Sequence, residues 1–177
     1  MKEYVVLLDE TNTPKGKMLK SKVHSQYTPY HLAFSCYIIN DGKVLLTRRS
    51  LHKKAWPGVW TGSVCGHPLP NENIIDAVHR RTQQELGIKL TNVKLALPAF
   101  SYTAVDSNNI MENELCPVFV AHAEKEIHPN HKEVIQFEWV NIADIIKSIK
   151  NTPFLFSPWM VKQLENNKLR HTLMNKV

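Results

Sequence analysis

Cysteine is scarce in this sequence of 177 residues, and long apolar runs are lacking. The three cysteines, Cys36, Cys65 and Cys116, lie far apart and form no C-x-x-C pair. An odd number of isolated cysteines argues against a disulfide framework and against a zinc knuckle. The first apolar run, Val5 to Leu8, has the length of a strand rather than of a signal peptide, and no run approaches the roughly 18 residues of a membrane span. We therefore expect a cytoplasmic protein that does not bind membranes.

Acidic residues are the minority among the charged residues. The 16 Asp and Glu residues face 22 Lys and Arg residues, so the formal net charge is +6 and the sequence pI is about 9.2. A basic surplus suits an anionic partner. The basic segment "TRRSLHKK" at 47–54 and the pair Arg80 and Arg81 come without an aromatic RNA-binding motif. A small phosphorylated ligand therefore competes with nucleic acid as the partner, and a solvated basic surface is the alternative for any single lysine.

The length and the pattern of apolar residues predict one domain over residues 1–177 with a mixed α/β (α+β) fold. Strands are expected in six segments, at 4–8, 31–40, 43–49, 59–64, 111–123 and 134–140. A turn is expected at "TNTPKG", and the Asp41-Gly42 pair predicts a hairpin. Helices are expected at 73–86, 141–149 and 157–167, the first of them capped by Asn73 and stopped by Gly87.

Two carboxylates share one face of a predicted strand. Glu112 and Glu114 lie two residues apart, and the same face is expected to hold Ile110, Cys116, Val118 and Val120. Two like charges on a mostly apolar face are costly unless a cation or a proton compensates them. The pair therefore indicates a metal site or a carboxyl held ready for proton transfer, and a solvated strand end is the alternative.

The stretch "TGSVCGHP" places a thiol and an imidazole one glycine apart, at Cys65 and His67. A turn with a buried cysteine and a solvated histidine would explain it without any function. If His67 met His24, His31 and the two carboxylates in space, three imidazoles and two carboxylates would suit a six-coordinate divalent ion such as Mg²⁺ or Mn²⁺, and zinc less clearly.

The central predicted helix carries charge on its core-facing stripe. Ile74, Val78, Arg81 and Glu85 follow one another at helical spacing. Arg81 and Glu85 then form either a simple i,i+4 ion pair or a carboxylate at the edge of a ligand cavity.

The segment 66–88, "GHPLPNENIIDAVHRRTQQELGI", resembles the Nudix box. The positions that match the motif are Gly66, Glu72, Arg80, Glu85 and Gly87. Arg81 and Gln84 replace glutamates of the motif, and Thr82 replaces its apolar residue. Because those glutamates normally hold the Mg²⁺ for diphosphate hydrolysis, ordinary Nudix hydrolysis is disfavoured.

The segments "HLAFSCYI", "TRRSLHKKAWPGVWTGSVCGHP", "YTAVDSNNIMENELCPVF" and "FSPWM" resemble type 1 isopentenyl-diphosphate isomerases, and the resemblance extends from Tyr4 to Gln163. It implies a Nudix-like mixed β-sheet sandwich flanked by helices. It also implies that the protein interconverts isopentenyl and dimethylallyl diphosphate by protonation and deprotonation, in isoprenoid biosynthesis. The expected partner is this small diphosphate, with no nucleic acid and no membrane, and the expected state is a monomer or a weak homodimer.

By position, the resemblance also implies the site residues. The metal ligands of the family fall on His24, His31, His67, Glu112 and Glu114, for Mn²⁺ or Mg²⁺, or Zn²⁺. Cys65 is the implied catalytic thiol and Glu114 the catalytic carboxyl, assisted by Tyr102. Trp159 lines the cavity. The residues implied to meet the diphosphate are Lys20, Arg49, Lys53 and Arg81. A Mg²⁺ that arrives with the diphosphate is expected at Glu85 and at the Cys65 backbone carbonyl. A Nudix hydrolase of nucleotides and a phosphate- or RNA-binding module are the rival interpretations.

Overall fold

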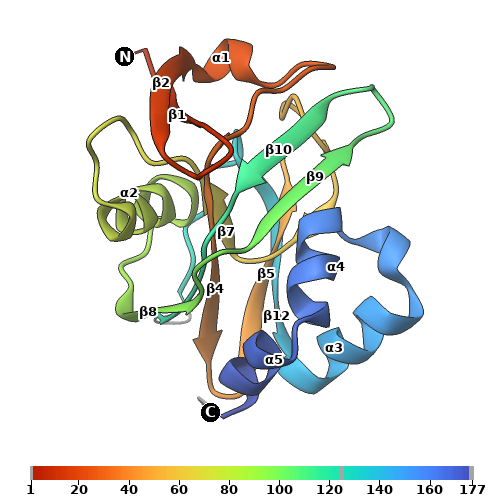
Figure 1. The fold of residues 1–177 in the computed structure, drawn as a ribbon. Coiled ribbons are helices and arrows are strands. Elements are labelled where there is room, and N and C mark those ends of the chain that lie inside the picture. Colours follow the sequence, from red (N-terminus) through yellow and green to blue (C-terminus); the bar gives the residue numbers. More distant parts are fainter. Residues whose placement is uncertain (1, 124–125, 176–177) are drawn as a thin grey trace.

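A computed structural model describes residues 2–123 and 126–175. Two mixed β-sheets form the framework (Figure 1). The first has five strands, in the order β2 (Pro14–Leu19), β1 (Tyr4–Leu8), β3 (His31–Leu32), β10 (Met111–Leu115) and β9 (Ser101–Val105). The main path of the second is β12 (Val134–Asn141), β5 (Lys43–Arg49), β4 (Phe34–Asn40), β11 (Val118–His122) and β8 (Thr91–Leu97). Two short strands extend it, β6 (Trp60–Thr61) on β5 and β7 (Val64–Gly66) on β4.

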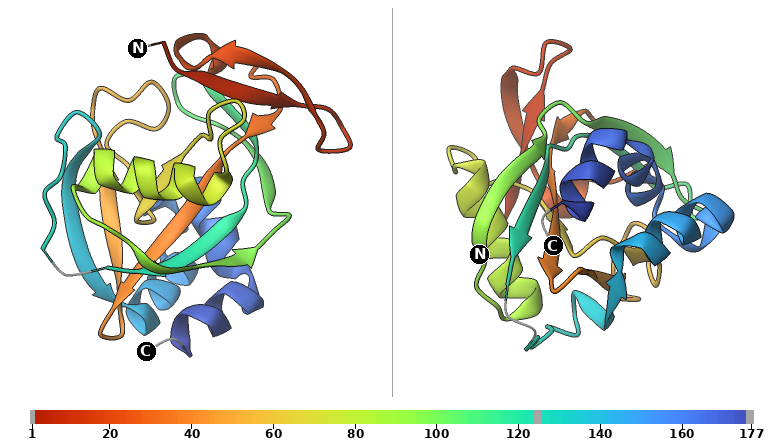
Figure 2. Two further views of the ribbon diagram at one scale, coloured as in Figure 1. Left: turned by 90° about the vertical axis from the view of Figure 1, so that its left-hand side faces the viewer. Right: turned by 90° about the horizontal axis from the view of Figure 1, so that it is seen from below.

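Four of the helices cover the two faces of the second sheet (Figures 1 and 2), and the short helix Lys20–Val23 lies beside β1 and β2 of the first sheet. The helices are α1 (Lys20–Val23), α2 (Ile74–Leu86), α3 (Ile142–Asn151), α4 (Pro158–Glu165) and α5 (Asn167–Met174), with a 3-10 turn at Pro153–Leu155. Helix α2 lies on one face, and α3, α4 and α5 lie on the other. The predicted mixed β-sheet sandwich flanked by helices is confirmed. Within the described residues, no helix combines the length and apolar character that a membrane crossing needs.

Strand β4 shows why the sheet is covered on both sides. Tyr37 and Ile39 pack into a cluster with α3, α4 and α5, whereas Phe34 and Ile38 pack into the cluster beneath α2. Successive side chains of a strand point to opposite faces, so an unbroken apolar strand requires an apolar layer on each side. The site described below lies where this strand passes the five-stranded sheet.

Several local predictions are confirmed at their boundaries. The side chain of Asn73 accepts a hydrogen bond from the Ile75 backbone N–H at 2.9 Å, and Gly87 ends α2 in the left-handed conformation with φ of 69°. Asp41 and Gly42 have φ of 46° and 70° and form the hairpin between β4 and β5. The buried positions of α2 include Val78, Arg81 and Glu85, as the helical spacing predicts.

Other local predictions were wrong. The expected single strand at 111–123 is two strands in different sheets, because Pro117 has no N–H to continue a ladder and the chain crosses over there. Val118 and Val120 therefore do not extend the face of Glu112. The segment 59–64 is also divided, into β6 and β7, which pair with different strands of the second sheet. Strand β2 begins inside the expected turn, at Pro14. Elements β8, β9, α1 and α5 were not predicted.

Candidate active site

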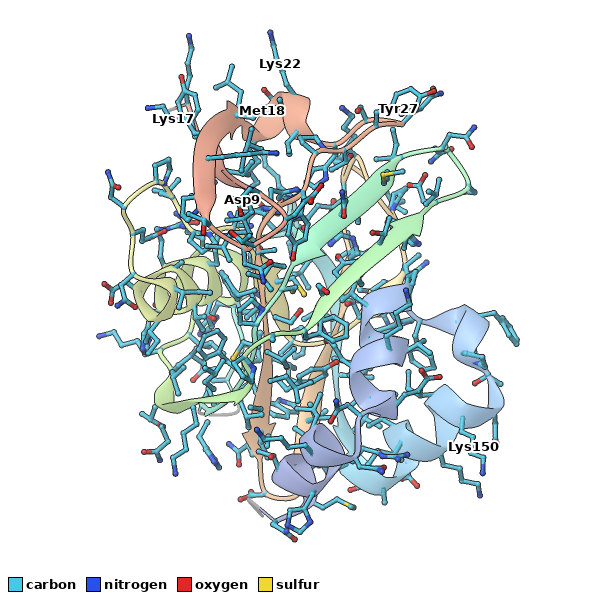
Figure 3. All side chains as sticks on the ribbon, viewed as in Figure 1. Asp9, Lys17, Met18, Lys22, Tyr27 and Lys150 are labelled. Carbon is cyan, nitrogen blue, oxygen red and sulfur yellow. The ribbon has the colours of Figure 1, made fainter. Side chains whose placement is uncertain are left out.

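A cavity of about 610 Å³ opens between the five-stranded sheet, strands β4 and β7, and helix α4. Most of the predicted site residues line it, namely Lys20, His24, Arg49, Lys53, Cys65, His67, Arg81, Tyr102, Glu112, Glu114 and Trp159. His31 is fully buried within 3.3 Å of Glu114. Lys22 points away from the molecule (Figure 3) and Lys17 Nζ lies over the Tyr4 ring, 5.2 Å from its centre, whereas Lys20 lines the cavity.

Strand pairing brings the imidazoles and carboxylates together. Glu114 lies opposite His31 in the parallel β10–β3 pair. Glu114 Oε1 is 3.3 Å from His31 Nε2 and 3.0 Å from His67 Nε2, and these two nitrogens are 3.2 Å apart. Glu112 Oε2 is 3.1 Å from His24 Nδ1. The three imidazoles and two carboxylates that spacing alone could not connect therefore form one cluster.

The donor atoms of this cluster fit a divalent cation. Within the described residues, the buried His67 Nδ1 has no hydrogen-bond partner, and His24 Nδ1 and Glu112 Oε2 face each other at 3.1 Å without forming a well-aligned hydrogen bond. His31 Nδ1 lies 2.8 Å from the Pro29 carbonyl, so Nδ1 carries a proton, and in the neutral imidazole the lone pair on Nε2 faces the cluster. Burial lowers the pKa of His67 to about 3, which leaves its imidazole neutral. Neutral imidazoles with carboxylates are a donor set for divalent ions.

A second carboxylate, Glu112, and a tyrosine, Tyr102, adjoin Glu114. Burial and the neighbouring Glu114 raise the pKa of Glu112. Tyr102 OH donates a hydrogen bond to Glu114 Oε2 at 2.9 Å. Burial raises the pKa of Tyr102 well above its usual range, so its hydroxyl keeps its proton and remains a donor.

The thiol and the aromatic residues form the remaining wall. Cys65, half-buried on β7, lies in the same cavity as Glu114. Burial raises the pKa of its thiol to about 11. The Trp159 ring lies 5.8 Å from the Tyr102 ring and 5.5 Å from the Trp56 ring, in an edge-on arrangement with Trp56. The Arg49 guanidinium stands 5.4 Å from the centre of the Trp159 ring.

Comparison with known proteins identifies the family. The NUDIX domain family matches residues 29–160. The chain is 50% identical to isopentenyl-diphosphate Delta-isomerase of Salmonella arizonae, over 97% of this chain and 94% of the relative. It is 48% identical to the protein of the same name from Kocuria rhizophila, over 97% of this chain and 96% of the relative. This chain belongs to the isopentenyl-diphosphate Delta-isomerase family.

Solved structures show the same fold at low identity. The protein DR0079 of Deinococcus radiodurans superimposes with a TM-score of 0.71 at 16% identity, over 92% of this chain and 98% of that one. A MutT NUDIX hydrolase of Burkholderia pseudomallei superimposes with a TM-score of 0.60 at 23% identity, over 78% of this chain and 98% of that one. These structural similarities show that the chain has the Nudix fold.

In this member of the isomerase family, helix α2, the helix of the Nudix-box segment, supports the cavity walls. It contributes Arg81 to the cavity lining but no carboxylate. Arg80 pairs with Glu72 at 2.7 Å and donates to the His67 carbonyl at 3.1 Å, which ties the loop before α2 to the helix. A Cβ at position 66 would approach Arg81 Cγ to 2.8 Å, so glycine is needed where the helix packs on β7. Glu85 is buried in an i,i+4 ion pair with Arg81 and is not among the cavity-lining residues.

Three basic side chains at the rim of the cavity, those of Lys20, Lys53 and Arg81, are paired with glutamates that the sequence did not predict for the site. Lys20 pairs with Glu3 at 2.7 Å, Lys53 pairs with Glu133, and Arg81 lies 3.4 Å from Glu133 as well. Neither Glu3 nor Glu133 lies in a recognisable motif. Each is distant in the sequence from the lysine with which it pairs, so only the folded chain shows the pairing. The structure also brings Ser35, a residue not predicted for the site, into the cavity lining next to Cys65. A lone polar residue in the apolar run "AFSCYII" was the available signal.

Proposed function

We propose that this chain interconverts isopentenyl and dimethylallyl diphosphate, using Cys65 and Glu114 as the proton-transfer groups. One observation carries the proposal: a thiol and a tyrosine-bound carboxyl line the same cavity, beside an aromatic wall and a basic rim. The names of its relatives support the same reaction. The replacement of box glutamates by Arg81 and Gln84 argues against ordinary diphosphate hydrolysis.

The reaction moves a double bond by adding one proton and removing another. Protonation of the terminal CH₂ carbon gives a tertiary carbocation at its neighbour, and loss of a proton from the carbon beyond completes the shift. An alkene is a very weak base, so the acid must be held close and water kept out. In one direction the protonated Glu114 carboxyl, hydrogen-bonded to Tyr102, delivers the proton, and the Cys65 thiolate accepts the other. The two roles exchange when the reaction runs backwards.

The wall and the rim serve the intermediate and the diphosphate. The face of Trp159 stabilises the carbocation by up to ~2 kcal/mol when it is desolvated. Packing against Tyr102 and Trp56 holds this ring in place. Lys20, Arg49 and Lys53 bind the diphosphate, which would otherwise leave readily from the allylic product.

The metal cluster would hold a divalent ion through the side chains described above, namely His24, His31, His67, Glu112 and Glu114. When bound, that ion supplies positive charge and a fixed orientation to the Glu114 carboxyl. The choice among Mg²⁺, Mn²⁺ and Zn²⁺ stays a prediction. A second ion at Glu85 and the Cys65 carbonyl also stays a prediction. In this structure Glu85 Oε1 is engaged by Arg81. The single domain, the monomeric or weakly dimeric state and the cytoplasmic location also stay predictions.

The test is incubation of the protein with isopentenyl diphosphate and divalent metal, followed by measurement of the acid-labile allylic product. The same preparation is assayed for phosphate release from common nucleoside diphosphates. We expect allylic product and no phosphate release. Phosphate release without allylic product would instead identify a hydrolase and would contradict the proposal.

A further inference from the structure

A chain of buried polar side chains runs through the apolar core and ends at the thiol of Cys65. Ser35 and Tyr37 on β4 and Gln163 on α4 are each at most 2% exposed. Tyr37 belongs to the apolar cluster between the sheet and the C-terminal helices. Polar groups in such a place are costly unless each finds a partner. These three side chains are hydrogen-bonded to one another in a row that ends at the cavity.

The contacts are continuous. Tyr37 OH donates to Gln163 Oε1 at 2.8 Å, and Gln163 Nε2 donates to Ser35 Oγ at 3.0 Å. Ser35 Oγ then lies 3.3 Å from two sulfur atoms, those of Cys65 and Cys116. Ser35 and Cys65 are direct neighbours across the β4–β7 ladder, so the backbone fixes the approach of the hydroxyl to the thiol.

The hydrogen-bonding capacity of Ser35 determines which sulfur receives its proton. A hydroxyl donates once and accepts twice. One acceptor position is taken by Gln163. Cys116 is 1% exposed and does not line the cavity, and Ser35 is the only hydrogen-bond partner of its sulfur within residues 2–123 and 126–175. The arrangement that gives the Cys116 S–H a partner fills the second acceptor position of Ser35 with that S–H, and it directs the single proton of Ser35 to Cys65 Sγ.

We infer that Ser35, held by Gln163 and Tyr37, is a positioning residue that orients the thiol of Cys65. Because the inner side of the sulfur accepts the Ser35 hydrogen bond, the S–H of Cys65 cannot turn inward and is directed into the cavity, toward the substrate carbon. This is the form of Cys65 that serves the direction of the reaction in which the thiol delivers the proton and the Glu114 carboxylate accepts the other. This inference rests on the proposed isomerase function. A purely structural role for Ser35 would make a different prediction, because it would not require the S–H bond of Cys65 to point in a particular direction.

The kinetic test compares Ser35→Ala with Ser35→Thr, which keeps the hydroxyl, and with Ser63→Ala as the matched control. Ser63 is a fully buried serine, and within the part of the chain that the structure describes its hydroxyl bonds to two backbone groups, the Ile38 N–H and the Leu45 carbonyl. For Ser35→Ala we expect kcat to fall about tenfold, the effect of one lost hydrogen bond, with KM within twofold of wild type. Ser35→Thr should recover most of kcat, and Ser63→Ala should keep it. Equal kcat in Ser35→Ala and Ser63→Ala would overturn the inference.

A spectroscopic test does not depend on activity or on a well-folded Ser35 variant. The S–H stretching bands in the Raman spectrum of the wild-type protein can be assigned by difference, with Cys65→Ala and Cys116→Ala. An S–H that donates to oxygen vibrates at lower frequency, so the Cys116 band should lie below the Cys65 band. A Cys65 band at the lower frequency would mean that Cys65 donates to Ser35, and the inference would fail. If the wild-type protein formed no allylic product, the proposed function would fail, while the band order would still test the direction of this bond.

Discussion

The hydroxyl of Tyr102 offers the sharpest test of the proton-transfer group, because one atom can be removed without changing the wall. Tyr102 is 7% exposed, and its ring packs against Trp159 and Phe100. Tyr102→Phe keeps that packing and deletes only the 2.9 Å hydrogen bond to Glu114 Oε2. A buried hydrogen bond to a charged group contributes about 1.5–3 kcal/mol. If that energy is needed in the transition state, kcat falls by about one to two orders of magnitude.

The assay is steady-state formation of acid-labile product at saturating isopentenyl diphosphate. We expect KM to change little, since the Tyr102 hydroxyl donates to Glu114 rather than to a residue proposed to bind the diphosphate. Tyr30→Phe is the matched control, because Tyr30 OH donates to Asn12 at 2.8 Å, an exposed contact outside the cavity lining. A kcat for Tyr102→Phe within twofold of the Tyr30→Phe value would refute the role of this hydroxyl.

Three other predictions concern the wall, the metal cluster and the Nudix helix. Trp159→Phe should keep partial turnover and Trp159→Ala should lose far more, since a smaller ring still offers a π face; equal turnover in the two would remove support for cation stabilisation. His67→Ala should lose bound metal and turnover together, and unchanged metal content by elemental analysis would exclude His67 as a ligand. Arg80→Ala should reduce the free energy of unfolding by about 1 kcal/mol near neutral pH. The hydrogen bond from Arg80 holds the pKa of Glu72 below its ordinary 4.5. The greater stability of the wild type over Arg80→Ala is therefore present above pH 4.5 and is lost as the pH falls through the lowered pKa of Glu72 in the folded state. A difference in thermal unfolding that persisted in acid would contradict this reasoning.

Local signals were sufficient to predict helix α2 and the β4–β5 hairpin. Asn73 and Gly87 act within one turn of the chain, and Asp41 with Gly42 adopts the turn that two residues of this kind favour. The break at Pro117 was missed although a proline within a strand pattern signals it, because the apolar residues on both sides read as one run.

The site was less accessible to sequence reasoning than the fold. Glu112 and Glu114 stood out because two carboxylates on an apolar face are costly. Their meeting with His31 and His67 depends on the parallel pairing of β3 with β10 and on the course of β7, which no local pattern encodes. The family resemblance proposed these partners, whereas spacing left them open. The hydrogen bonds of Ser35 depend in the same way on contacts between distant segments.

Turnover and metal content, measured on the same preparations of wild-type protein and Cys65→Ala, test the central claim most directly. Cys65 contacts Ser35 through its sulfur and lies two residues from His67, so one loop places a thiol and an imidazole in the same cavity, where we propose that they serve the substrate and the metal. The account predicts that wild-type protein converts isopentenyl diphosphate to the allylic isomer, and that Cys65→Ala folds and binds metal normally but forms no product. Near-normal turnover in Cys65→Ala would contradict it, because the thiol would then be a buried structural residue.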